Sequence, residues 1–124
     1  MTAQGLQVLI VDDNAMNRKL ISMLLKNMGS VVDEATGGID CLEFVTQKKY
    51  DVIFMDHLMP LMDGVETLNR MMDLDTSLNK ETPVIALTAD DLRNGKDFFL
   101  DAGFNGYLVK PVLPQHLEDM IAEL

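Results

Sequence analysis

This 124-residue chain has one cysteine, no tryptophan and no long apolar run. The single Cys41 excludes a disulfide within the chain and fits a reducing compartment. No apolar run approaches the roughly 20 residues of a membrane-spanning helix, and residues 1–5 lack the basic and apolar regions of a signal peptide. We therefore expect a cytoplasmic location and no membrane contact by this segment.

Basic residues are also scarce. Ten Lys and Arg residues stand against twenty Asp and Glu residues, which gives a formal net charge of −10. Nucleic-acid binding relies on Lys and Arg contacts to phosphates, so the composition argues against it. An acidic chain suits a metal ion or a cationic ligand instead. The length is typical of one domain, and we expect a single domain over residues 1–124, with residues 1–5 as a flexible lead.

Short apolar runs without polar alternation recur along the chain, as in strands that are buried on both faces of a parallel sheet. Segments with helical spacing follow each run. The pattern predicts strands at 6–11, 30–35, 51–55, 84–87 and 106–109, and helices at 15–28, 39–48, 64–74, 92–102 and 114–124. Successive strand–helix units with right-handed crossovers predict an α/β protein, a three-layer sandwich with helices on both faces of the sheet.

The first predicted helix has a clear beginning, end and apolar face. Asn14 is a suitable N-cap and Gly29 a suitable stop. The residues expected to face the sheet are Leu20, Ile21, Leu24, Leu25 and Met28.

Polar residues follow four of the predicted strands: Asp12 and Asp13, Asp56, Thr88, and Lys110. Because a ligand site in an open α/β sheet lies beyond the carboxyl ends of the strands, these side chains should converge. Three carboxylates that lie close together raise one another's pKa values unless a cation neutralises them, and oxygen-rich sites of this kind suit Mg²⁺. The set could present one carboxylate as a nucleophile, with cations and donors around a phosphoryl group.

The strand ends carry four motifs: Val11-Asp12-Asp13-Asn14, Met55-Asp56-His57-Leu58-Met59-Pro60 with Met62-Asp63-Gly64, Leu87-Thr88-Ala89, and Tyr107-Leu108-Val109-Lys110-Pro111. Together they resemble the receiver domain of two-component response regulators, over essentially the whole chain. The resemblance implies a flavodoxin-like (βα)5 fold with strand order 2-1-3-4-5. It also implies a phosphorelay signalling receiver that catalyses only its own phosphorylation and dephosphorylation. A stand-alone regulator and a receiver from a hybrid sensor histidine kinase both fit.

The resemblance further implies roles for the acidic residues. Asp56 matches the phosphoacceptor, and Asp12 and Asp13 match the acidic pair that holds Mg²⁺, with Mn²⁺ as an alternative ion. In that family Asp13 and Asp56 coordinate the metal directly, Asp12 acts largely through water, and the backbone carbonyl of Leu58 completes the protein ligands.

The same resemblance implies a switch. Thr88 matches the hydroxyl that moves onto the phosphoryl group, and Lys110 matches the ammonium that pairs with that group. Tyr107 matches the aromatic residue whose rotamer follows, which changes the face made by the fourth helix, fifth strand and fifth helix. A cis peptide bond between Lys110 and Pro111 would aim the lysine inward.

The implied partner is a histidine kinase or a histidine phosphotransfer domain that carries the phosphohistidine. We expect it to dock on the outer side of the first helix, although a solvated face is an equally good interpretation of that surface. The docking residues would be Met16, Arg18, Lys19 and Met23. A phosphorylation-dependent dimer is a further option. His57 and His116 are interpreted as partly exposed histidines rather than metal ligands, with His57 pointing away from the acidic pair.

Two other classes remain as alternatives. A haloacid-dehalogenase-like phosphatase also uses a nucleophilic aspartate and Mg²⁺, but it needs Asp-x-Asp after the first strand, where this chain has Asp12-Asp13-Asn14. A flavin or nucleotide carrier would need a Gly-rich phosphate loop at the same turn, which the chain lacks.

Overall fold

The computed structural model describes residues 2–89 and 97–124. Strands and helices alternate along these residues: β1 Gln7–Val11, α1 Ala15–Asn27, β2 Val31–Ala35, α2 Gly38–Gln47, β3 Val52–Asp56, α3 Gly64–Asp73, β4 Val84–Thr88, α4 Phe98–Ala102, β5 Gly106–Val109 and α5 Pro114–Ala122. Among these helices, none is long and apolar enough to cross a membrane.

The strands form one parallel sheet in the order β2-β1-β3-β4-β5. The order confirms the predicted flavodoxin-like α/β fold and places β2 at an edge, with β1, β3 and β4 inside. Asp56 is level with Leu87 on β4, and Thr88 is level with Val109 on β5. The carboxyl ends of the inner strands therefore meet at one edge of the sheet.

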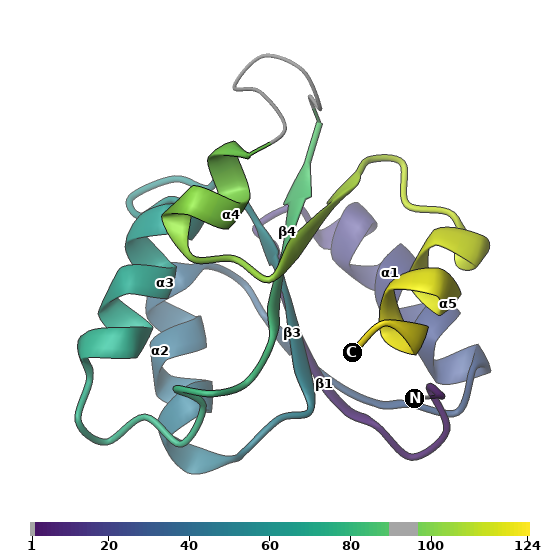
Figure 1. The fold of residues 1–124 in the computed structure, drawn as a ribbon, viewed down its shortest axis with the longest axis horizontal. Helices are drawn as coiled ribbons and strands as arrows, with labels where there is room; N and C mark the ends of the chain where they lie inside the picture. Colours follow the sequence, from purple (N-terminus) through teal and green to yellow (C-terminus); the bar gives the residue numbers. More distant parts are fainter. Residues whose placement is uncertain (1, 90–96) are drawn as a thin grey trace.

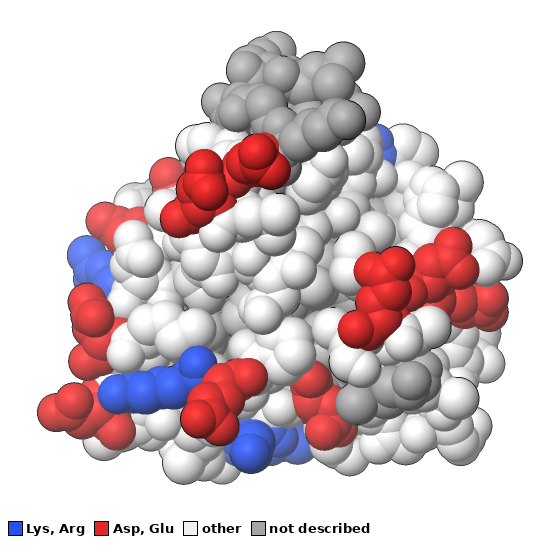
Figure 2. Space-filling model, in the orientation of Figure 1, with Lys and Arg blue, Asp and Glu red and all other residues white. Residues whose placement is uncertain are grey.

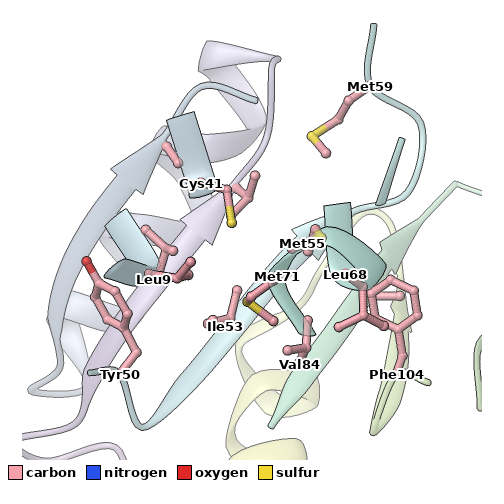
Figure 3. Close-up of a cluster of buried hydrophobic side chains, with 14 of the residues drawn as sticks. Leu9, Cys41, Tyr50, Ile53, Met55, Met59, Leu68, Met71, Val84 and Phe104 are labelled. Carbon is pink, nitrogen blue, oxygen red and sulfur yellow. The ribbon is translucent and has the colours of Figure 1, made fainter. Parts of the chain in front are cut away.

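Helices cover both faces of the sheet, with α1 and α5 on one side and α2, α3 and α4 on the other (Figure 1). Alternate residues of β1 point to opposite sides: Val8 and Ile10 pack in the core beneath α1 and α5, whereas Leu9 and Val11 pack in the core beneath α2 and α3. Figure 3 shows part of the second core around Leu9. Burial on both faces explains why the strand sequences show no polar alternation.

Helix α1 begins and ends as predicted, but its buried face is narrower. The Asn14 side chain accepts a hydrogen bond from the Asn17 backbone N–H, and Gly29 adopts a positive φ of 96° after the helix. Leu20, predicted to face the sheet, is 43% exposed. It lies about 100° around the helix from the buried Ile21, which places it on the flank rather than on the inner face.

Two other predicted segments lie partly outside the described residues. The fourth helix was predicted at 92–102, but the described part begins at Phe98, and residues 92–96 lie outside the described residues. Residues 1–5 were predicted to be a flexible lead. In the structure the Ala3 carbonyl accepts a hydrogen bond from the Ser30 hydroxyl, and the Gly5 N–H donates to the Gly29 carbonyl. These bonds join Ala3 and Gly5 to the turn between α1 and β2, and the flexibility of the lead stays a prediction.

Candidate functional site

A cleft of about 240 Å³ opens at the carboxyl edge of the sheet. Its walls come from the loop after β1, the ends of β3 and β4, and the residue that follows β5. The lining residues are Asp13, Asn14, Asn17, Asp56, His57, Leu58, Thr88, Ala89 and Lys110. The structure thus brings together the polar strand ends that the sequence analysis singled out.

Three carboxylates meet at this cleft with different degrees of burial. Asp12 is fully buried, Asp56 is buried at the end of β3, and Asp13 is exposed. One carboxylate oxygen from each lies within 4.8 Å of the others. Oxygen atoms grouped in this way form a donor set that suits Mg²⁺.

Lys110 holds two of these carboxylates. Its Nζ lies 3.0 Å from Asp56 Oδ1 and 3.2 Å from Asp12 Oδ2. The peptide bond to Pro111 is cis, as predicted. Asp12 is fixed further, because its Oδ1 accepts a hydrogen bond from the Asn14 N–H at 2.9 Å. Asp12 is thereby held as a structural anchor of the site.

Burial and neighbouring charges shift the pKa values of Asp56 and Lys110. Burial raises the pKa of Asp56 to about 6, with Lys110 opposing the rise and Asp12 adding to it. Burial disfavours the Lys110 cation, but the two carboxylates outweigh burial and raise the pKa of Lys110 above its ordinary value. Asp56 is therefore the carboxylate whose charge the folded protein resists in the absence of a metal ion.

Thr88 and Tyr107 lie on the neighbouring strands. Thr88 is buried at the end of β4, lines the cleft, and accepts a hydrogen bond at its backbone carbonyl from the Lys110 N–H at 2.7 Å. Tyr107 on β5 is partly exposed, and its ring centroid is 5.8 Å from that of Phe99 on α4. The two proposed switch residues therefore lie on adjacent strands.

The histidines have different surroundings. The ring of His57 packs edge-on against Phe98 and Phe99, with centroids 5.6 and 5.1 Å away, whereas His116 is exposed on α5. Sequence reasoning did not find the ring contacts of His57, since they depend on how α4 packs on the sheet.

The predicted docking face of α1 is only partly exposed. Met16 and Met23 are 81% and 51% exposed, and the Lys19 side chain is 69% exposed. The Arg18 side chain, by contrast, is 12% exposed and does not lie on the outer face as predicted. Sequence reasoning assigned Leu20 to the core, yet it joins the exposed apolar side chains of this helix.

Arg18 is turned inward by two partners. Its Nε lies 3.0 Å from Glu34 on β2, and its Nη1 donates to the Asp12 carbonyl at 2.8 Å. Burial works against the Glu34 anion, but Lys19 and Arg18 hold the pKa of Glu34 below its ordinary value. The sequence signal for the contact between Arg18 and Glu34 was the charge of Glu34 within the strand predicted at 30–35.

The model of the response regulator receiver domain family matches residues 8–122. The chain is 38% identical to hybrid signal transduction histidine kinase E of Dictyostelium discoideum, and 33% identical to the sensor protein GacS of Pseudomonas syringae pv. syringae. Each alignment covers 98% of this chain, but only 7% and 14% of those relatives. The chain thus spans a small part of the length of these relatives.

Solved structures match over almost the whole chain. The receiver domain of sensor histidine kinase PA1611 from Pseudomonas aeruginosa PAO1, with a magnesium ion coordinated in its active site cleft, has a TM-score of 0.85 and 30% identity, over 96% of each chain. The Saccharomyces cerevisiae Ssk1 receiver domain, in complex with the histidine phosphotransfer protein Ypd1, has a TM-score of 0.85 and 27% identity, over 97% of this chain and 88% of that one. Motifs, fold and family match agree: the chain belongs to the response regulator receiver domain family and is a phosphorelay signalling receiver.

Proposed function

We propose that this receiver accepts a phosphoryl group from a phosphohistidine donor onto Asp56. The observation that carries the proposal is the position of Lys110 Nζ, 3.0 Å from Asp56 Oδ1, in the cleft that Thr88 also lines. A carboxylate oxygen of Asp56 would form the new bond to phosphorus. The N–P bond of the donor would break, and its electron pair would stay on the imidazole nitrogen. Lys110 would neutralise charge on the phosphoryl oxygens.

The surroundings of the three carboxylates support Asp56 as the acceptor. Asp12 does not line the cleft, and both of its carboxylate oxygens have partners, the Asn14 N–H and Lys110 Nζ. Asp13 lines the cleft but is exposed and forms no ion pair among the described residues. Asp56 alone combines access to the cleft, burial and a cation at hydrogen-bond distance.

The same residues fit a divalent cation. We assign Asp13 and Asp56 as the carboxylates that would bind Mg²⁺ directly and Asp12 as a carboxylate that would act through water. The backbone carbonyl of Leu58, which lines the cleft, would be a further ligand. When bound, the ion would supply positive charge that offsets repulsion between the carboxylates and the phosphoryl oxygens. Mn²⁺ prefers the same oxygen donors and should substitute.

The reaction changes the protein itself. Asp56 is the group modified, and no separate substrate is turned over, so the chain's chemistry would be limited to its own phosphorylation and dephosphorylation.

The cytoplasmic location predicted from the sequence remains a prediction.

The partner would be a histidine kinase or a histidine phosphotransfer domain, as in the Ssk1 complex with Ypd1. On α1, the exposed Met16, Leu20 and Met23 are spaced four and three residues apart, so they lie along one side of the helix. This apolar stripe, with Lys19 beside it, would contact a helix of the donor. Arg18 would instead hold the loop after β1 in place through the Asp12 carbonyl.

The output surface would be the face of α4, β5 and α5, which Tyr107 joins to the site. Figure 2 shows uncharged surface there, with carboxylates over α4 and α5 on either side. Asp97, Asp101 and three acidic residues of the C-terminal segment are exposed, and the sole Lys or Arg in residues 97–124 is Lys110 at the site. A phosphorylation-dependent dimer through this face stays a prediction.

Acetyl phosphate with Mg²⁺ tests the assignment without any partner. Mass spectrometry should find one added phosphoryl group on the wild type and on Asp75→Asn, a control at an exposed aspartate. Asp56→Asn should gain none. Undiminished labelling of Asp56→Asn would contradict the proposal.

A further inference from the structure

An unbroken series of ring contacts links the residue after Asp56 to Tyr107. The His57 ring meets Phe99 at 5.1 Å with an interplanar angle of 87°, and it meets Phe98 at 5.6 Å and 66°. Phe99 in turn meets Tyr107 at 5.8 Å and 35°. Phe99 is buried, so it forms the centre of this cluster beneath α4. The His57 contacts are edge-to-face and the Phe99–Tyr107 contact is tilted. Aromatic pairs have preferred geometries, so displacement of one ring affects its neighbours.

The main chain of His57 is pinned on both sides. Its N–H donates to the Leu87 carbonyl at 2.9 Å, and its carbonyl accepts from the Gly64 N–H at 2.8 Å. A Cβ at Gly64 would lie 2.7 Å from the Asp56 carbonyl oxygen, so glycine is needed for this close approach. Leu87 directly precedes Thr88, so the bond to Leu87 ties His57 to the end of β4.

The ring of His57 has no such polar anchor. Its Nδ1 is buried and has no hydrogen-bond partner among the described residues. A buried polar atom without a partner is unfavourable and calls for an explanation. The imidazole is held by packing against the phenylalanine rings. It can therefore move together with those rings, whereas a hydrogen bond would fix its position.

We propose that His57 is a positioning residue that transmits modification of Asp56 to Phe99 and Tyr107, along a route separate from the Thr88 hydroxyl. The inference rests on the proposed role of Asp56. A change at Asp56 reaches the His57 main chain directly, through the peptide bond that joins the two residues. The hydrogen bond to the Leu87 carbonyl connects that main chain to the end of β4. The ring then carries the change to α4 through its two phenylalanine contacts.

The composition allows a direct test, because the chain has two histidines and two tyrosines. One of each lies in the ring cluster, and the others, exposed His116 and buried Tyr50, lie outside it. NMR spectra of protein with ¹³C-labelled His and Tyr rings would be recorded before and after adding beryllofluoride with Mg²⁺, which mimics a phosphoryl group. The His57 and Tyr107 signals should shift several-fold more than those of His116 and Tyr50.

Variants separate transmission from simple packing. His57→Leu should reduce the Tyr107 shift to less than half of its wild-type size, and the control His116→Leu should leave it unchanged. His57→Phe keeps a ring in place and should preserve most of the shift. An undiminished Tyr107 shift in folded His57→Leu would overturn the proposal.

The wild-type spectrum can still overturn the proposal if His57→Leu fails to fold. The same samples would be labelled with acetyl phosphate and weighed by mass spectrometry. A wild type that gains no phosphoryl mass would contradict the proposed function. A wild type that gains the phosphoryl mass, but whose His57 signal does not shift on adding beryllofluoride, would overturn only the proposed role of His57.

Discussion

Lys110 reaches across β4 to place its Nζ 3.0 Å from Asp56 Oδ1 at the end of β3. The same Nζ lies 3.2 Å from Asp12 Oδ2, so one cation lies between two carboxylates of neighbouring strands. The lysine thus balances the charge of the resting site and stands ready beside the oxygen that we propose to react. Its two roles can be separated by measurement.

Replacing Lys110 by methionine should slow phosphorylation of Asp56 by acetyl phosphate by about 10- to 100-fold, because one group that stabilises developing charge is lost. Time-resolved mass spectrometry would give the rate. Lys49→Met, at an exposed lysine, is the matched control and should react like the wild type. A Lys110→Met protein that reacts at the wild-type rate would show that the ammonium does not act on the phosphoryl group.

The metal-free protein should lose stability between about pH 4 and pH 7. The pKa of Asp56 is raised from 3.8 to about 6 in the folded state, so its protonated form favours folding. That contribution is complete below the unfolded pKa and is lost as the pH rises through the folded pKa.

Asp56→Asn isolates this contribution. Urea unfolding in the presence of a chelator, at pH 4.5 and at pH 7, would measure the free energy of unfolding of both proteins. Glu34, whose lowered pKa acts with the opposite sign, is present in both and cancels in the comparison. The variant should lose less stability than the wild type over this range. Equal losses would rule out Asp56 as the source.

Asp13→Ala should lose affinity for Mg²⁺ while keeping the fold. Asp13 is exposed and contributes one of the three clustered carboxylates, so its removal costs a ligand but little packing. Calorimetric titration would measure affinity, and circular dichroism would check folding. The control Asp75→Asn should bind like the wild type. Unchanged affinity in Asp13→Ala would refute the assigned metal site.

The apolar stripe of α1 should matter for transfer from a protein donor but not from a small molecule. Glutamate at Leu20, which is 43% exposed, should slow transfer from a cognate phosphorylated histidine phosphotransfer protein at least tenfold. Labelling by acetyl phosphate should stay within twofold. Leu78→Glu, at a leucine that is 50% exposed, is the matched control. Slowing of both reactions alike would point to damage at the site rather than lost docking.

The sequence predicted the sheet and the cleft better than the helix surfaces. Strands buried on both faces leave an unmistakable apolar pattern, and the polar residues that end them must meet at one edge, so Asp56 and Lys110 could be grouped in advance. Arg18 could not be placed, because its inward turn depends on Glu34 from a neighbouring strand. The contacts of His57 were likewise invisible, since α4 brings the phenylalanine rings to it. Helical periodicity fixes a face only to within a residue or so, which is why Leu20 was misassigned.

Chemical trapping of the phosphorylated residue tests the central claim most directly. Sodium borohydride reduces an aspartyl phosphate to homoserine, and peptide mapping then identifies the modified position. After reaction with acetyl phosphate and Mg²⁺, the account predicts homoserine at position 56 and aspartate at positions 12 and 13. Homoserine at either of those two positions, with Asp56 intact, would contradict it.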